Sequence, residues 1–113
     1  MSNDKKTSGI PAAEAVTVQE LVQYQAGAVV SRQLVKQDKG NVTLFAFDAG
    51  QELSEHTAPF DALVLGLEGE ADISISGAPH HVAAGQILKL PAGKPHAVKA
   101  ATPFKMLLVM IRE

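Results

Sequence analysis

The feature that most restricts the fold of this chain is a change in its hydrophobic pattern near residue 28. From there to the C-terminus, short β-branched and apolar runs recur at about ten-residue spacing, separated by turn residues such as Gly, Pro, Asp and Ser. Most runs alternate apolar and polar residues, which is the period of a strand with one buried face. The pattern predicts an all-β sandwich or barrel with strands at residues 29–36, 41–48, 51–56, 61–68, 71–76, 79–83, 87–90, 96–100 and 104–111.

The composition limits both the size of the domain and its partners. A chain of 113 residues makes one domain that needs neither a disulfide nor a structural metal for stability. The formal net charge is -2 and Lys and Arg are not clustered, so we expect no nucleic-acid and no membrane partner. The chain has no cysteine, which excludes thiolate ligands and a cysteine nucleophile. No apolar run is long enough to span a bilayer, and we expect a cytoplasmic protein.

The first part of the chain differs from the strand-rich remainder. Residues 1–15 are expected to be a flexible N-terminal tail, with a single domain over residues 16–113. Thr17 and Glu20 have the spacing of a capping box, in which each side chain accepts a hydrogen bond from the backbone amide of the other. The spacing predicts one short helical turn ahead of the first strand.

Two motifs of glycine, proline and histidine lie within the predicted strands. The first runs from Gly50 through His56 to Gly69, and the second, at residues 85–96, reads Gly-Gln-Ile-Leu-Lys-Leu-Pro-Ala-Gly-Lys-Pro-His. Together they resemble the two signature motifs of the cupin superfamily, in particular the small single-domain cupins of the Cupin_2 type. The resemblance covers about residues 29–111. It implies a double-stranded β-helix, or jelly-roll barrel, that holds a metal on three histidines and one carboxylate or amide.

The metal ligands implied by the resemblance are incomplete in this chain. His56 and His96 match two of the four ligand positions, whereas Ala58 and Ala62 occupy the other two. Ala100 stands where the second motif usually closes with asparagine. Two imidazoles are one ligand short of a catalytic zinc site, and a non-haem iron triad needs a carboxylate. We therefore expect a partly lost metal site; the alternative is a reduced-ligand site for Fe, Mn, Ni or Zn on the two histidines.

Three acidic residues near His56 are candidates for a missing ligand. Glu52 has the parity of His56 but would lie about 13 Å away along a regular strand. Asp61 and Glu55 have the opposite parity and should point outward unless a bulge redirects them. Asp61 is the better candidate, because Pro59 just before it is compatible with an irregular backbone.

His80 and His81 are adjacent in the sequence. A regular strand points neighbouring side chains to opposite faces, so this pair cannot chelate one ion. We expect His81 to be solvated, whereas His80 shares the parity of Val82 and could approach a cavity.

Alanine at two ligand positions also makes the barrel interior larger and more apolar. The residues expected to line a cavity are Ala58, Ala62, Val64, Val98, Phe45, Phe47, Met106 and Met110. Such a cavity suits a small, mostly apolar molecule with one polar group. The aromatic and Met residues among them could equally belong to an ordinary core.

Three functions are compatible with these residues. The first is a metal-free binding module, in which His56 and His96 supply hydrogen bonds to a small organic ligand. The second is a metal-dependent enzyme that resembles cupin dioxygenases, isomerases or decarboxylases and uses the two histidines with water or Asp61. The third resembles the metal-free sugar epimerases of the superfamily, but a histidine base needs an orienting carboxylate, and none of inward parity is evident near His56 or His96. We expect ligand binding, and whether the chain is an enzyme stays open.

The last predicted strand, residues 104–111, is apolar on both parities. Leu63, Leu65 and Leu67 likewise form an apolar face opposite Ala62 and Val64. A strand with one solvated face would alternate, so both faces of these strands should be covered. Two alternatives are open: a second subunit in a symmetric homodimer, or the N-terminal segment folded back over its own barrel.

Overall fold

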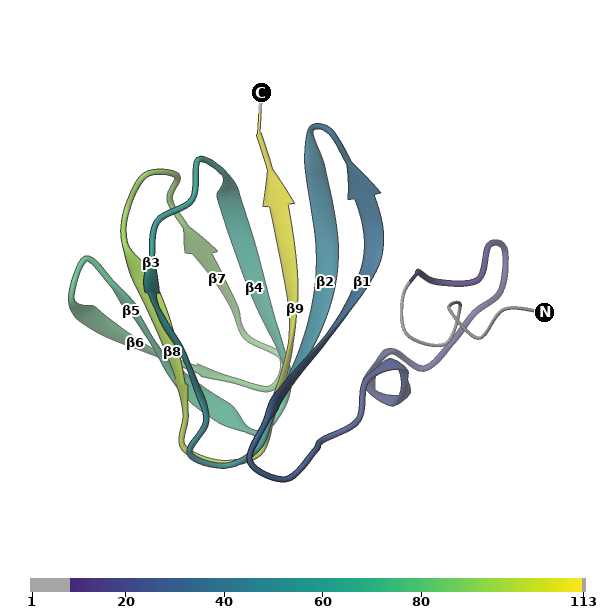
Figure 1. Ribbon diagram of the computed structural model, residues 1–113, viewed down its shortest axis with the longest axis horizontal. Coiled ribbons are helices and arrows are strands. Elements are labelled where there is room, and N and C mark those ends of the chain that lie inside the picture. Colours follow the sequence, from purple (N-terminus) through teal and green to yellow (C-terminus); the bar gives the residue numbers. More distant parts are fainter. Residues whose placement is uncertain (1–8, 113) are drawn as a thin grey trace.

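The structure, a computed structural model, describes residues 9–112. Within this range, nine antiparallel strands form two sheets that face each other, close together at one end and splayed at the other (Figure 1). The strands are β1 (Val29–Gln37), β2 (Gly40–Phe47), β3 (Glu52–His56), β4 (Asp61–Glu68), β5 (Glu70–Ile75), β6 (Ala78–Ala83), β7 (Ile87–Leu90), β8 (His96–Ala100) and β9 (Phe104–Ile111). Every limit lies within one residue of its predicted position, and the all-β prediction is confirmed.

The strand order identifies the architecture as a jelly-roll barrel. One sheet has the order β1-β2-β9-β4-β7 and the other β3-β8-β5-β6. Most strands that follow each other in sequence therefore lie in opposite sheets, which is the double-stranded β-helix that the motifs implied. The same topology places β3, from the first motif, beside β8, from the second.

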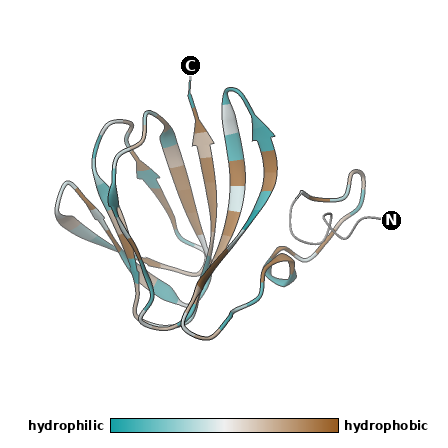
Figure 2. Cartoon of the chain, viewed as in Figure 1, coloured by the Kyte–Doolittle hydropathy of each residue, from teal (hydrophilic) through white to brown (hydrophobic). Residues whose placement is uncertain are grey.

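The core fills the space between the inner faces of the two sheets. Alternate residues of the strands point inward. The buried members are Phe47, Ala62, Val64, Ala71, Ile73, Val82, Leu90, Val98, Ala100, Phe104 and Met106. Figure 2 shows that β9 is hydrophobic along most of its length, as expected for a strand whose outer face is apolar as well.

The N-terminal segment covers part of the outer face of the five-stranded sheet. After the 3-10 helix η2 (Val18–Leu21), Val22 is buried against Leu44 and Ala46. Around this contact pack the half-buried residues Val18, Leu21, Tyr24, Val30, Leu34, Leu67 and Leu107. The chain thus folds back over its own barrel, which is one of the two alternatives expected for this face.

Lys105 holds the N-terminal segment to the barrel. Its side chain lies on the outer face of β9 and is buried. The ammonium donates to the backbone carbonyl of Gln19 at 2.6 Å and lies 3.7 Å from a carboxylate oxygen of Glu68. The other carboxylate oxygen accepts from the Tyr24 hydroxyl at 2.9 Å. Burial raises the pKa of Tyr24 and Glu68 raises it further, so the hydroxyl stays protonated and donates.

The predicted helical turn is present, but the predicted capping box is wrong. The Thr17 side chain makes no capping hydrogen bond; instead, its backbone carbonyl accepts from the Glu20 amide at 3.0 Å. One turn of 3-10 helix closes this backbone bond by itself and leaves the side chain in solvent. Nothing between residues 9 and 112 is a helix long and apolar enough to cross a bilayer.

The predicted tail is only partly within the described residues, since residues 1–8 lie outside them. Gly9 contacts the barrel. Its amide donates to the carbonyl of Gln33 at 2.6 Å, and its carbonyl accepts from the Arg32 side chain at 3.2 Å.

Gly69, which closes the first motif, occupies a position that only glycine fits. Its φ of 70° is in the left-handed region, which costs a residue with a Cβ atom about 1–2 kcal/mol. A Cβ atom there would also collide with the backbone carbonyl of Pro103. The motif glycine therefore permits the tight turn between β4 and β5 and the close approach of the loop before β9.

Candidate functional site

A cavity of about 160 Å³ lies inside the barrel, between the inner faces of the two sheets. Its lining comes from β2, β3, β4, β7, β8 and β9 and from the loop between β3 and β4. The lining residues are Phe45, Leu53, His56, Ala58, Phe60, Ala62, Val64, Leu90, His96, Val98, Met106, Leu108 and Met110. His56 and His96 alone among them carry a side-chain nitrogen or oxygen, so the cavity is apolar apart from one imidazole pair.

Seven of the eight residues expected to line a cavity do so in the structure: Ala58, Ala62, Val64, Val98, Phe45, Met106 and Met110. Phe47 does not. It is fully buried and packs against Phe104, with ring centroids 5.9 Å apart. Phe47 ends β2 and pairs with Phe104, which begins β9. These strand ends lie where the two sheets come together (Figure 1).

Four lining residues were not anticipated from the sequence: Leu53, Phe60, Leu90 and Leu108. Leu108 has the parity of Met106 and Met110, so strand alternation alone could have identified it. Leu53 and Phe60 lie at a bulge and in a loop, where the period of a strand gives no prediction.

His56 and His96 are direct partners across β3 and β8. Their ring centroids lie 4.4 Å apart, with the rings inclined by 69° in an edge-to-face arrangement. The Nδ1 atom of His56 lies 2.8 Å from the carbonyl oxygen of Ser54. A carbonyl only accepts, so this nitrogen carries the proton, and Nε2 of the neutral ring is an acceptor.

His96 is the buried member of the pair. The residue is only 9% exposed. Its Nδ1 atom has no hydrogen-bond partner within residues 9–112. Burial lowers the pKa of His96 and the neighbouring His56 lowers it further, while the nearby backbone of Lys94 raises it. His96 is therefore a neutral imidazole at pH 7.

A bulge in β3 corrects the expected orientation of the acidic residues. The register shifts between Leu53 and His56, so both of these side chains contact the interior although they are three residues apart. Glu52, predicted to share the parity of His56, is exposed and lies opposite the exposed Lys99 in the register of β3 and β8. Glu55 is exposed as well.

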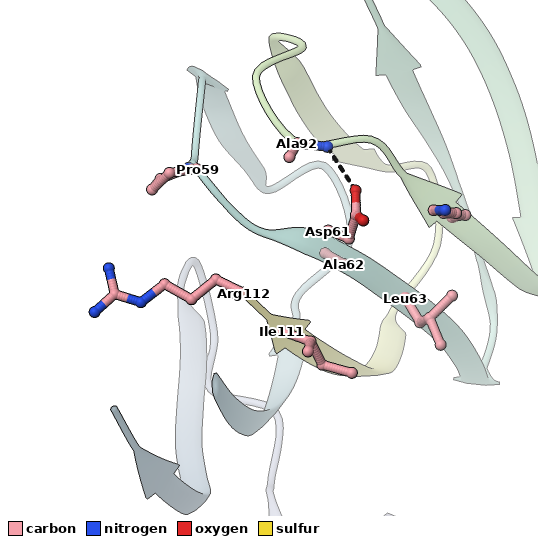
Figure 3. A pocket seen from close by; sticks show the side chains of 8 residues that line it. Pro59, Asp61, Ala62, Leu63, Ala92, Ile111 and Arg112 are labelled. Atoms are coloured by element: carbon pink, nitrogen blue, oxygen red, sulfur yellow. Dashed lines mark hydrogen bonds between the residues drawn. The ribbon is translucent and has the colours of Figure 1, made fainter. Parts of the chain in front are cut away.

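Asp61 also points away from the histidines. Its carboxylate accepts a hydrogen bond from the Ala92 amide at 3.0 Å and faces a groove of about 650 Å³ on the outer surface (Figure 3). A second bond, from the Gly93 amide to the carbonyl of Ala58 at 3.0 Å, joins the same two segments. Asp61 therefore fastens the β3–β4 loop, which carries Ala58 and Phe60 into the cavity lining, to the turn before β8.

The remaining histidines lie outside the cavity lining. His80 is exposed on β6. His81 is exposed on the same strand and lies between two carboxylates, 2.8 Å from Glu70 and 3.2 Å from Asp72. These two contacts use opposite nitrogens of the ring, so the three residues do not converge on one point.

The residues of the cavity do not fit a cupin metal centre. Within residues 9–112, no group of three or more His, Cys, Asp and Glu side chains could hold a metal ion. His56 and His96 provide two neutral nitrogen ligands, and Ala58 and Ala62 add none. A transition-metal site needs at least one further protein ligand to be held firmly.

The structure is similar to that of a protein of unknown function from Streptococcus pyogenes, with 37% identity and a TM-score of 0.89 over 93% of this chain and 92% of that chain. It is also similar to a cupin superfamily protein from Desulfitobacterium hafniense, with 28% identity and a TM-score of 0.87 over 93% and 96% of the two chains.

A cupin 2 conserved barrel domain protein from Leptotrichia buccalis shows 42% identity and a TM-score of 0.80, over 83% of this chain and 46% of that chain. Among curated proteins, no relative matches. The family model described as a cupin domain matches residues 43–111, which include both motifs and all thirteen cavity residues. The chain therefore belongs to the Cupin_2 family of cupin domains.

Proposed function

We propose that this cupin binds a small, mostly apolar organic molecule inside its barrel, with His56 and His96 supplying the polar contacts. The observation that carries this proposal is the 160 Å³ cavity lined by apolar side chains and one imidazole pair. A concave, mostly apolar site with a few polar groups at one place is the usual form of a small-molecule site.

Two features of the histidines favour binding over acid–base catalysis. A histidine that works as a base is normally oriented by a carboxylate within hydrogen-bond reach. His56 is oriented by a backbone carbonyl, and the buried nitrogen of His96 has no partner among the described residues. The pair is thus arranged to contact a ligand rather than to transfer a proton.

Binding can be tested by NMR titration of the 15N-labelled protein with benzene and toluene. The proposal predicts saturable shifts at Val64, Val98 and Leu108, which line the cavity from three strands. Ala58→Leu fills the cavity from the β3–β4 loop and should weaken these shifts at least tenfold. Ala97→Leu is the matched control, because Ala97 lies between two inward residues of β8 and is not part of the lining.

Two results would overturn the proposal. The first is an absence of saturable shifts at cavity residues with either probe. The second is a stoichiometric transition metal in protein purified without chelator, lost together in His56→Ala and His96→Ala, which would establish the metal-dependent alternative instead.

A further inference from the structure

We propose that the ligand of this cavity is an uncharged, ring-sized molecule that carries one hydroxyl group, that is, a phenol or a compound of the same shape and polarity. This inference rests on the proposed function and adds the chemical class of the ligand. It follows from the hydrogen-bond inventory of the imidazole pair, from the charge that the cavity can accept and from the cavity volume.

The imidazole pair has more acceptors than donors. Two neutral imidazoles have two N–H groups and two lone pairs. The N–H of His56 is used by the Ser54 carbonyl, which leaves one N–H, on His96, against two lone pairs. Even if that N–H bonded the other ring, one lone pair would stay without a donor. A buried acceptor without a donor costs about 1–3 kcal/mol, so a ligand that donates a hydrogen bond is favoured.

A charged ligand is disfavoured at this place. An anion would need a cation beside it, and no Lys or Arg side chain lines the cavity. A cation would have to leave water for an interior in which no carboxylate lines the cavity. Burying an unpaired charge costs far more than one hydrogen bond returns. An uncharged hydroxyl satisfies the free lone pair without this cost and can also accept from the His96 N–H.

The volume and the lining select a ring-sized molecule. An apolar cavity of about 150 Å³ is known to accommodate benzene, and the cavity here measures about 160 Å³. Phe45 and Phe60 offer aromatic surfaces, and Met106 and Met110 offer thioethers. Both kinds of side chain make favourable contacts with an aromatic ring.

The experiment compares phenol, benzene and benzoate by NMR titration at pH 7.5 with EDTA present, so that metal does not contribute. Phenol is uncharged at this pH because a phenolic hydroxyl has a pKa of about 10. Phenol should bind about fivefold or more tightly than benzene, because one hydrogen bond contributes an affinity ratio of about this size. Benzoate should bind at least tenfold more weakly than phenol. In the double variant His56→Ala with His96→Leu, which removes both free lone pairs, the preference for phenol over benzene should disappear while benzene still binds.

Each other outcome overturns the inference. Equal affinity for phenol and benzene would show that the imidazoles do not recognise the hydroxyl group. The proposed function would then hold without this inference. Tightest binding of benzoate would show an anion site. Failure of all three probes at the cavity would overturn both proposals. If the double variant does not fold, His56→Ala is measured alone, because His56 is exposed and its removal leaves the core residues in place. It removes one of the two free lone pairs and should reduce the preference for phenol.

Discussion

The ammonium group of Lys105 lies 4.9 Å from the centre of the Tyr24 ring. Lys105 belongs to the last strand and Tyr24 to the N-terminal segment, so this cation–π contact and the bond to Gln19 join the two ends of the domain. A buried lysine is stable only if its charge is compensated, and here a ring face, a carbonyl and the Glu68 carboxylate do so.

Replacing Lys105 by Ala should therefore lower the free energy of unfolding by about 1.5–3 kcal/mol, the range for hydrogen bonds to charged groups. Urea denaturation measures this loss, and limited proteolysis should show faster cleavage near Gly27. Lys99→Ala, at an exposed position of β8, is the control and should change stability by less than about 0.5 kcal/mol. Equal effects of the two substitutions would contradict the role assigned to Lys105.

The stability of the barrel should depend on the protonation of His96. Its pKa is lowered by burial and by His56, so the folded protein binds this proton less readily than the unfolded chain. The stabilising contribution is then complete above the unfolded pKa of about 6.5 and is lost as the pH falls from there toward the lowered pKa of the folded state. Urea midpoints measured between pH 7.5 and pH 5 should fall, and His96→Gln should fall less. His80→Gln, on the exposed part of β6, should retain the wild-type slope.

Strand alternation predicted the faces of the barrel well, since His96, Val98 and Ala100 follow each other inward along β8 as a regular pleat requires. It could not predict which inward residues line the cavity and which are packed in the core. Phe45 and Phe47 share a face, but only Phe45 lines the cavity. Phe47 is the last residue of β2, and β2 ends where the two sheets come together (Figure 1). Parity says which face a residue occupies and nothing about the distance between the sheets at that level.

The bulge in β3 escaped prediction for a different reason. Residues 52–56 contain no glycine or proline that would mark an irregular strand, yet the register with β8 shifts between Leu53 and His56. The shift arises from pairing with a strand some forty residues away, which is a tertiary effect. Its consequence is that Glu52 turns outward and leaves the imidazole pair without a carboxylate.

At Gly69, the contribution of a close backbone contact to stability can be measured separately from the contribution of backbone conformation. Gly69 and Gly77 both have positive φ, of 70° and 83°, but only Gly69 has the Pro103 carbonyl in the place of a Cβ atom. Gly77→Ala should cost about 1–2 kcal/mol from its conformation alone. Gly69→Ala should cost clearly more, because the loop before β9 must also move. Thermal denaturation of the two variants compares them, and similar losses would contradict the contact.

Asp61 should control access to the cavity. Asp61→Ala removes the acceptor for the Ala92 amide, so that amide should exchange with solvent faster, and NMR line shapes should show faster exchange of a bound probe. Asp61→Asn retains an oxygen acceptor and should restore much of the protection. Asp61 is exposed, and the loss of overall stability should stay near the value of one hydrogen bond, about 1 kcal/mol. Unchanged exchange at Ala92 in the alanine variant would refute this role.

The outer face of the five-stranded sheet should bind a second copy of this chain. The N-terminal segment covers only part of it, and Leu63, Ile87 and Ile111 stay 37%, 62% and 58% exposed. Asp61 and Lys89 border the same groove as Leu63 and Ile111 (Figure 3). In a two-fold interface each patch meets its own copy, so a patch with both signs of charge can place Asp61 opposite the partner's Lys89.

Sedimentation velocity over a range of protein concentrations should therefore show a dimer. Ile87→Lys puts a charge on the most exposed residue of this apolar patch and should shift the equilibrium to monomer. The folded monomer should keep its thermal stability. Ala78→Lys adds the same charge at an exposed position of the other sheet and should leave the dimer intact. A monomeric wild-type protein at all concentrations would show that this apolar face is left in solvent.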